Sequence, residues 1–399
     1  MRLKSAFVVA CALFILVAQA PWAHAAVPSL EGVEPGFKFV VMGDNRTGGA
    51  DVLQVTDAYK RILFETNQLQ PVFAVLTGDM IRGGVVEDEN TIREMWARWI
   101  EATSALQVPF FKVVGNHDVW SKKSEALYRE IFDEPLYYSF DYGGSHFVVL
   151  DTEFQEAPHK IAGEQLNWLE KDLSNSEGAE STFVFLHRPL WQTDPEGWAP
   201  IHRLLLDKRV DAVFGGHYHI YAAQQIDGIH YIITGGAGAP VGSRGEVIGN
   251  FLNYCLVSVS PNAISIAVIK PGSIEPEDVV LAEDLPRAKK IASEWIGDPK
   301  VDLSAAGEKK PVSLEIRNLS SEPVSGEVHW NLDGCGWCIE PASTSYSAPA
   351  GATTTLQFLA TPPRGNPTAV PNARVTFPLR PGRSFTIEKA LVILGSTNQ

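Results

Sequence analysis

The chain has 399 residues, of which 45% are hydrophobic and 20% are charged, and its formal net charge is 33 − 47 = −14. This length is too great for one ordinary domain and suits two, and the composition is that of a folded protein. An acidic surface repels nucleic acids and anionic membranes, which argues against a nucleic-acid-binding protein. It also repels phosphate groups, so phosphate chemistry here would need local positive charge, such as that of a metal site.

Residues 1–25 have the pattern of a secretion signal. Met1-Arg2-Leu3-Lys4 is basic, an apolar run covers about residues 6–20, and Ala23-His24-Ala25 supplies the small-x-small cleavage pattern. This run is shorter than the roughly 20 apolar residues of a membrane span. We therefore predict cleavage after Ala25 and a secreted or periplasmic mature chain without a transmembrane span. A lipoprotein signal ending at Cys11 is the second interpretation.

Three cysteines follow the predicted cleavage site. Cys255 lies in an apolar run and is predicted to be a buried, inert thiol. Cys335 and Cys338 have the C-x-x-C spacing of redox and zinc sites, but His329 is the only histidine after His230. A local disulfide is therefore favoured over zinc, and over free thiols because the predicted compartment is oxidising.

From about residue 37 to residue 268, short apolar strands alternate with helical stretches, which is typical of layered α/β architecture. A hairpin over residues 137–150 is predicted to turn at Gly143-Gly144. The predicted strands cover residues 39–42, 73–76, 110–114, 183–186, 212–214, 231–233, 255–259 and 264–269, and the predicted helices cover residues 52–65, 91–106 and 164–173, with one more beginning near residue 124.

The composition changes after about residue 281. A charged helical stretch over residues 286–295 ends at Gly297-Asp298-Pro299, and the following residues are rich in Thr, Ser, Pro and Val. Short strands separated by turn residues indicate an all-β sandwich. We predict a signal peptide at 1–25, an α/β domain at 26–284, a linker helix at 285–299 and an immunoglobulin-like β-sandwich at 300–399.

Polar side chains follow five of the apolar strands, at the point where each strand ends. Because ligands of open α/β sheets bind beyond the carboxyl ends of the strands, these side chains are expected to face one crevice. Oxygen and imidazole ligands suit Zn, Mn or Fe, and the flanking glycines are expected to let the chain turn sharply. The residues concerned are Asp44, Asp79, Asn116, His117, Asp118, His187, His217 and His219.

Each of these residues has an ordinary explanation when it is taken singly. Asp44 and Asp79 could cap the helices that follow them, and His187 could be a loop histidine before a proline. His217 and His219 could be two side chains on one face of a strand. All of these explanations would have to hold together, in order and at strand ends, so the combination favours a metal site.

The order of these motifs resembles the calcineurin-like metallophosphoesterase family over about residues 37–270. The motifs are Gly43-Asp44, Gly78-Asp79, Gly115-Asn116-His117-Asp118, His187 and Gly216-His217-Tyr218-His219. The resemblance implies a four-layer α/β/β/α sandwich with a two-metal site, here followed by the C-terminal β-sandwich.

The resemblance also implies a role for each residue. Asp79 would bridge two metals, the second metal would also take Asn116, His187 and His217, and the first would take Asp44 and His219. His117 would contact the phosphoryl group or protonate the leaving oxygen, with Asp118 orienting its ring. Two metals would clamp the attacking and leaving oxygens and lower the pKa of bound water.

One position departs from the family pattern. The first motif is normally Asp-x-His, whereas this chain has Asp44-Asn45-Arg46, and residues 80–84 offer no tyrosine as a substitute. Arginine cannot coordinate a metal. The alternatives are a single-metal enzyme, a two-metal enzyme with water in the gap, and a site that only binds. Arg46 follows Asp44 by two residues, so its side chain is expected to face the crevice and to bind a phosphoryl oxygen. The alternative is a surface arginine, or one paired with an acidic neighbour.

The sequence therefore predicts an exported hydrolase of small phosphate mono- or diesters that uses one or two ions of Mn, Fe or Zn. The rival hypothesis is a catalytically impaired binding protein on the same scaffold. A third hypothesis places the function in residues 300–399, as a module that anchors the chain to a surface or a polysaccharide.

Overall fold

The computed structural model describes residues 36–84, 86–153, 157–242, 245–261, 263–303, 308–363, 369–380 and 383–394. The predicted signal peptide lies outside these residues. Within the described ranges, every helix is too short or too polar to cross a membrane.

Two six-stranded sheets form the body of the N-terminal part. The first has the order β12-β11-β10-β1-β2-β3 and the second has the order β4-β5-β6-β7-β9-β8. The strands of the first sheet are β1 (Phe37–Met42), β2 (Phe73–Leu76), β3 (Phe110–Lys112), β10 (Tyr254–Ser260), β11 (Ala263–Lys270) and β12 (Ser273–Pro276). Those of the second are β4 (Tyr138–Tyr142), β5 (Ser145–Val149), β6 (Ser181–Phe185), β7 (Ala212–Gly215), β8 (Tyr221–Ile226) and β9 (Ile229–Thr234).

Aromatic side chains fill the space between the two sheets. The ring of Phe39 on β1 lies 5.4 Å from that of Phe147 on β5 and 5.1 Å from that of Phe183 on β6, centroid to centroid. All three side chains are fully buried. Edge-to-face pairs of this kind contribute about 0.5–1.5 kcal/mol each beyond the area that they bury. The two sheets therefore pack face to face through a buried aromatic core.

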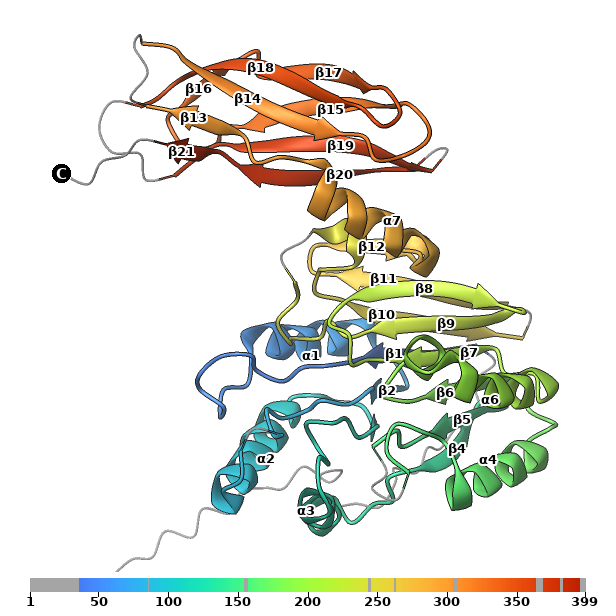
Figure 1. Cartoon of the computed structure of the whole chain (residues 1–399). Coiled ribbons are helices and arrows are strands. Elements are labelled where there is room, and N and C mark those ends of the chain that lie inside the picture. The colour runs from blue at the N-terminus through green and yellow to red at the C-terminus, as the bar shows by residue number, and fades with distance from the viewer. Residues whose placement is uncertain are drawn as a thin grey trace, which may run out of the picture.

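Helices cover the outer face of each sheet (Figure 1). The first sheet packs against α1 (Asp57–Leu69), α2 (Glu89–Thr103) and α3 (Lys122–Phe132). The second packs against α4 (Gly163–Asn175), α5 (Leu190–Thr193) and α6 (Pro195–Asp207). The result is the four-layer α/β/β/α sandwich that the family resemblance implied.

The predicted elements differ from the observed ones at helix boundaries, and strands β8 and β12 were not predicted. Helix α1 begins at Asp57 rather than near residue 52, because the Thr56 hydroxyl accepts a hydrogen bond from the backbone N–H of Tyr59 and caps the helix there. The hairpin of β4 and β5 turns at Gly143 and Gly144 as predicted, with φ of 58° and 78°. Helix α6 was missed, since Pro200 interrupts its sequence pattern.

The C-terminal part is a β-sandwich, in agreement with the prediction. One sheet has the order β16-β18-β14-β13-β21 and the other has the order β17-β15-β19-β20. The strands are β13 (Lys300–Asp302), β14 (Lys310–Arg317), β15 (Val324–Asn331), β16 (Cys338–Glu340), β17 (Ser343–Ala348), β18 (Thr353–Thr361), β19 (Asn372–Arg380), β20 (Arg383–Ala390) and β21 (Val392–Leu394).

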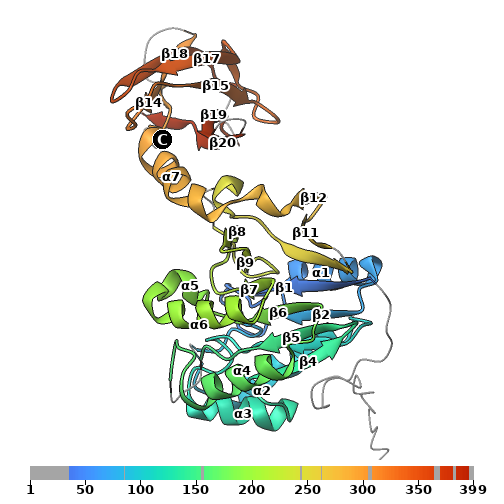
Figure 2. The ribbon, with the colours of Figure 1, turned by 90° about the vertical axis from the view of Figure 1, so that its right-hand side faces the viewer.

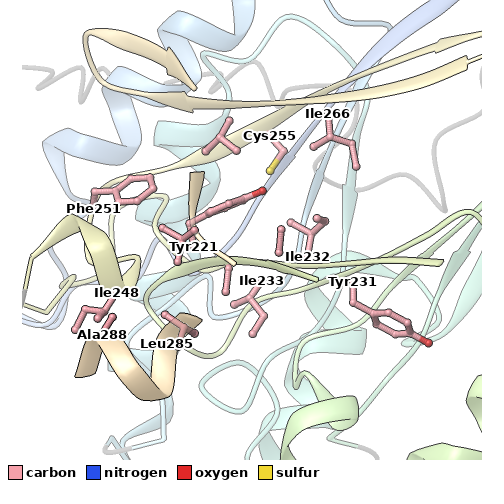
Figure 3. Close-up of a cluster of buried hydrophobic side chains, with 14 of the residues drawn as sticks. Tyr221, Tyr231, Ile232, Ile233, Ile248, Phe251, Cys255, Ile266, Leu285 and Ala288 are labelled. Carbon is pink, nitrogen blue, oxygen red and sulfur yellow. The ribbon is translucent and has the colours of Figure 1, made fainter. Parts of the chain in front are cut away.

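Helix α7 (Leu285–Lys290) and the π-helical turn Ile291–Trp295 connect the two parts (Figure 2). Leu285 and Ala288 pack beside the second sheet, within a cluster that includes Ile233 and Ile248 (Figure 3). At the other end, the ring of Trp295 lies 6.2 Å from that of Phe377 in the sandwich. One buried core thus runs through the connection. The division of the chain into independently folding domains stays a prediction.

The cysteine predictions had mixed outcomes. Cys255 is buried as expected, and burial raises the pKa of its thiol to about 12. Cys335 and Cys338 are free thiols, so the predicted disulfide is wrong. The Cys335 side chain is buried and donates a hydrogen bond to the Leu332 carbonyl, 3.1 Å away, whereas Cys338 is exposed.

We predict that Trp295→Ala destabilises the chain more than any surface substitution, because Trp295 is only 3% exposed where the connection meets the sandwich. Truncating a buried tryptophan costs about 3–5 kcal/mol. Urea denaturation followed by circular dichroism would measure the loss. Phe64→Ala is the control, because Phe64 is 64% exposed on α1 and its truncation is expected to change the free energy of unfolding by less than about 0.5 kcal/mol. Equal effects of the two substitutions would contradict the packing described above.

Candidate metal centre

Three of the candidate ligands have a left-handed backbone conformation. The φ angles of Asp44, Asp79 and His217 are 54°, 57° and 67°. Such conformations cost non-glycine residues of the order of 1–3 kcal/mol each and gather at functional sites. Here they turn three side chains into the crevice at the carboxyl ends of the strands.

The glycines beside these ligands act mostly through their lack of a side chain. A Cβ atom on Gly115 would lie 2.5 Å from Asp79 Oδ1, and one on Gly216 would lie 2.3 Å from Asp44 Oδ2. The expected sharp glycine turn occurs at Gly78, whose φ is 96°. At Gly115 and Gly216 that expectation is wrong, because these glycines instead permit close approach of backbone and carboxylate.

Four donor atoms converge at one point of the crevice. Asn116 Oδ1 lies 3.1 Å from His187 Nε2 and 2.9 Å from His217 Nδ1. His187 Nε2 also lies 3.3 Å from Asp79 Oδ1 and 3.3 Å from His217 Nδ1. These four residues are the set that the resemblance assigned to the second metal, and the structure brings them together.

The histidines of this set are prepared for metal binding. His187 Nδ1 donates a hydrogen bond to the Thr77 carbonyl at 2.8 Å, which leaves the lone pair on Nε2 directed at the other donors. Burial, together with the charges of His187 and Arg188, lowers the pKa of His217 to about 3. A neutral imidazole is the form that coordinates a metal. One carboxylate, one amide oxygen and two imidazoles fit a divalent ion such as Zn or Mn.

The second group of donors comprises Asp44, Asp79 and His219, whose ligand atoms all lie within 4.8 Å of one another. Asp44 Oδ1 is buried and has no hydrogen-bond partner among the described residues. Burial and the neighbouring Asp79 carboxylate raise the pKa of Asp44 well above its usual range. A buried oxygen without a partner is costly, and a cation beside it would remove that cost.

Arg46 occupies the edge of this second group. Its Nε donates to Asp79 Oδ2 at 3.1 Å, its Nη2 lies 3.5 Å from His219 Nε2, and its side chain is 13% exposed. The side chain therefore faces the crevice, as the two-residue spacing from Asp44 predicted. Although burial opposes ionisation, His187, His117 and Arg46 lower the pKa of Asp79 to about 2. The guanidinium thus supplies positive charge beside the carboxylate that was expected to bridge two metals.

The predicted role of Asp118 is wrong. His117 Nδ1 lies 2.9 Å from the Gly83 carbonyl, so this carbonyl, and not Asp118, orients the ring. The Asp118 carboxylate instead accepts hydrogen bonds from four backbone N–H groups, those of Asp79, Met80, Ile81 and Gly115, at 2.8 to 3.3 Å. Asp118 therefore holds the loop after β2 against the loop after β3.

One charged pair beside the site was missed by the sequence reasoning. Arg188 Nε lies 2.6 Å from Glu153 Oε1, and Arg188 Nη1 lies 3.1 Å from His217 Nε2. The only sequence signal was the position of Arg188 directly after the candidate ligand His187. A His217 that offers Nδ1 to a metal carries its proton on Nε2. In that tautomer, Nε2 of His217 cannot accept a hydrogen bond from Arg188. The Nη1 group of Arg188 is then free to donate to another acceptor.

Comparison with known proteins agrees with this geometry. Residues 37–221 match the family described as Calcineurin-like phosphoesterase. Purple acid phosphatase 23 of Arabidopsis thaliana is 28% identical over 212 residues, which are 48% of this chain and 40% of that protein. The chain therefore spans less than half of this relative's length. Human serine/threonine-protein phosphatase CPPED1 is 27% identical over 237 residues, which are 53% of this chain and 75% of that protein.

A solved structure shares the fold. The purple acid phosphatase PPD1 from yellow lupin seeds superposes with a TM-score of 0.50 at 15% sequence identity, covering 63% of this chain and 54% of that one. The predicted resemblance is thus confirmed for the N-terminal part of the chain.

We predict that Asp118→Asn loosens the site without touching a ligand, because an amide nitrogen would face N–H donors in place of a carboxylate oxygen. Each buried donor left unpaired costs about 1–3 kcal/mol. Metal content after dialysis and the midpoint of thermal unfolding should both fall. Asp57→Asn is the control, since the Asp57 side chain is 95% exposed. Full metal retention in Asp118→Asn would show that the loop does not depend on this carboxylate.

Proposed function

Because residues 37–221 form a calcineurin-like phosphoesterase domain, we propose that this chain is an exported, metal-dependent hydrolase of phosphate mono- or diesters. The observation that carries the proposal is the convergence of Asp79, Asn116, His187 and His217 on one point, with the lone pair of His187 directed at it. The basic and apolar pattern of residues 1–25 supports export.

The residues around this point are suited to phosphoryl transfer. The chemistry that a bound ion supplies is activation of water near neutral pH and neutralisation of phosphoryl charge. Nδ1 of His117 is held by the Gly83 carbonyl, which leaves Nε2 directed into the site, 4.0 Å from Asp79 Oδ2. From this position Nε2 can contact a phosphoryl oxygen or deliver a proton to the leaving oxygen.

Two arginines give the site its positive charge in an otherwise acidic chain. Arg46 and Arg188 lie at the two groups of donors, and each is held by a carboxylate, that of Asp79 or that of Glu153. Guanidinium groups bind phosphate oxygens through paired hydrogen bonds. The arginines can therefore offset the repulsion that a net charge of −14 imposes on a phosphate ester.

A screen of chromogenic phosphate mono- and diesters against the full chain loaded with Mn, Fe or Zn tests the proposal. We expect hydrolysis that stops when the metal is removed by a chelator and returns when the metal is added back. His187→Ala, which deletes a buried ligand, should lose metal and activity together. Hydrolysis that survives chelation and His187→Ala equally would sink the proposal.

For His117→Ala we expect turnover to fall about 10²–10⁴-fold, the usual contribution of a general acid or base, while metal content stays unchanged. The reason is that His117 reaches the site but lies outside both donor groups. Turnover per bound ion and metal analysis of the same sample would check this. A variant that loses its metal yet keeps its turnover per bound ion would refute the assigned role.

Arg46 determines how many ions the chain holds. Because the guanidinium donates to Asp79 and lies against His219, we expect fewer than two tightly held metals per chain. Arg46→Ala should raise KM and lower kcat, and Arg46→His should allow a second ion to bind. Metal analysis with steady-state kinetics measures all of these. Two stoichiometric metals in the unmodified chain, together with a fully active Arg46→Ala, would contradict this role.

Non-catalytic binding on the same scaffold is the second candidate. It is favoured by one observation, the arginine that stands where the family places a metal-ligating histidine. Calorimetry with inorganic phosphate separates the two functions. Tight phosphate binding without turnover of any ester would favour a binding protein.

A further inference from the structure

A cavity of about 450 Å³ opens beside the metal centre. Its walls include the candidate ligands His217 and His219, the side chains of Gln192 and Asn250, and Lys289 of helix α7. The linker helix therefore contributes directly to the surroundings of the site, although it follows the phosphoesterase sheets in the sequence.

The backbone of Lys289 is held in position by the packing of its helix, while the lysine side chain is exposed. Leu285 and Ala288, on the same helix, are buried against the second sheet beside Ile233 and Ile248 (Figure 3). The backbone N–H of Ala223 on β8 donates to the Val280 carbonyl at 2.9 Å, which ties the segment before the helix to the sheet edge. The lysine thus projects from an anchored element and not from a free linker.

Three polar side chains of the cavity have no partner among the described residues. Within the described ranges, the side chains of Gln192, Asn250 and Lys289 make no hydrogen bond or ion pair with another residue. Lys270 is paired with Glu246 and Lys208 with Glu177, whereas Lys290, the neighbour of Lys289 on α7, also has no ion pair among the described residues. Tyr218, 38% exposed, adds an aromatic ring whose centroid lies 5.3 Å from that of His217.

We propose that this cavity is the leaving-group subsite of the phosphoesterase and that it selects esters whose leaving group carries a second anionic group, bound by Lys289. This inference rests on the proposed function. The phosphoryl group would lie at the metal ligands and Arg46, while the body of the leaving group would lie against Tyr218 with its polar atoms facing Gln192 and Asn250. In a chain of net charge −14, an unpaired ammonium group provides a local positive charge that can bind an anionic group.

The test compares phenyl phosphate with 4-carboxyphenyl phosphate and the longer 4-(2-carboxyethyl)phenyl phosphate, using the metal-loaded full chain. We expect the unmodified protein to prefer at least one carboxylated ester in kcat/KM. Lys289→Ala should reduce that preference about 10-fold, the size of one charge-assisted hydrogen bond, mainly through KM. Lys290→Ala is the matched control, because Lys290 is the next residue of α7 and is exposed like Lys289, but lies outside the cavity walls.

The outcomes separate this inference from the proposed function. Equal kcat/KM values for all three esters, or equal losses in Lys289→Ala and Lys290→Ala, would overturn the subsite while the enzyme stands. If none of the esters is hydrolysed, calorimetry with the same three compounds decides. If a carboxylated ester binds more tightly than phenyl phosphate and only Lys289→Ala loses this difference, the subsite is supported and catalysis is rejected. If the three compounds bind equally, both the subsite and the proposed catalysis are rejected.

Discussion

The buried carboxylate of Asp79 is the group on which the arrangement of the site depends. Arg46, His187 and the backbone N–H of His117 all lie within 3.3 Å of its oxygens, and they come from three different loops. A buried negative charge of this kind is tolerable only when several positive or polar groups surround it. The Asp79 carboxylate therefore connects the loops of the site. The carboxylate of Asp118 in turn fixes the loop that bears Asp79.

The positions of the candidate ligands could be predicted from the sequence because they obey local rules. Each follows a short apolar strand, and strands of one sheet end at one edge. The spacing of Asp44 and Arg46 likewise placed the arginine in the crevice, where it lies against Asp79. The alternation of strands and helices predicted a layered α/β fold, the family resemblance implied its four layers, and the structure has them.

The remaining features depend on contacts that the sequence does not record. The partners of Asp118 are backbone N–H groups. Every residue except proline has such a group, so these contacts cannot be predicted from a pattern of side chains. Arg188 and Glu153 are 35 residues apart and meet only because β5 and β6 are neighbours. Cys335 and Cys338 have the spacing of a disulfide, yet one side chain is buried, the other is exposed and both are free thiols.

The connection between the two parts of the chain adds a constraint of its own. Leu285 and Ala288 fasten α7 to the phosphoesterase sheets, and Trp295, at the end of the following turn, fastens it to the sandwich. Lys289 lies between these two contacts. The connection therefore couples the position of the sandwich to that of the cavity wall that Lys289 forms. A helix held at both ends keeps its side chains in place better than a free linker does. The sandwich can thereby support the site without contributing a residue to it.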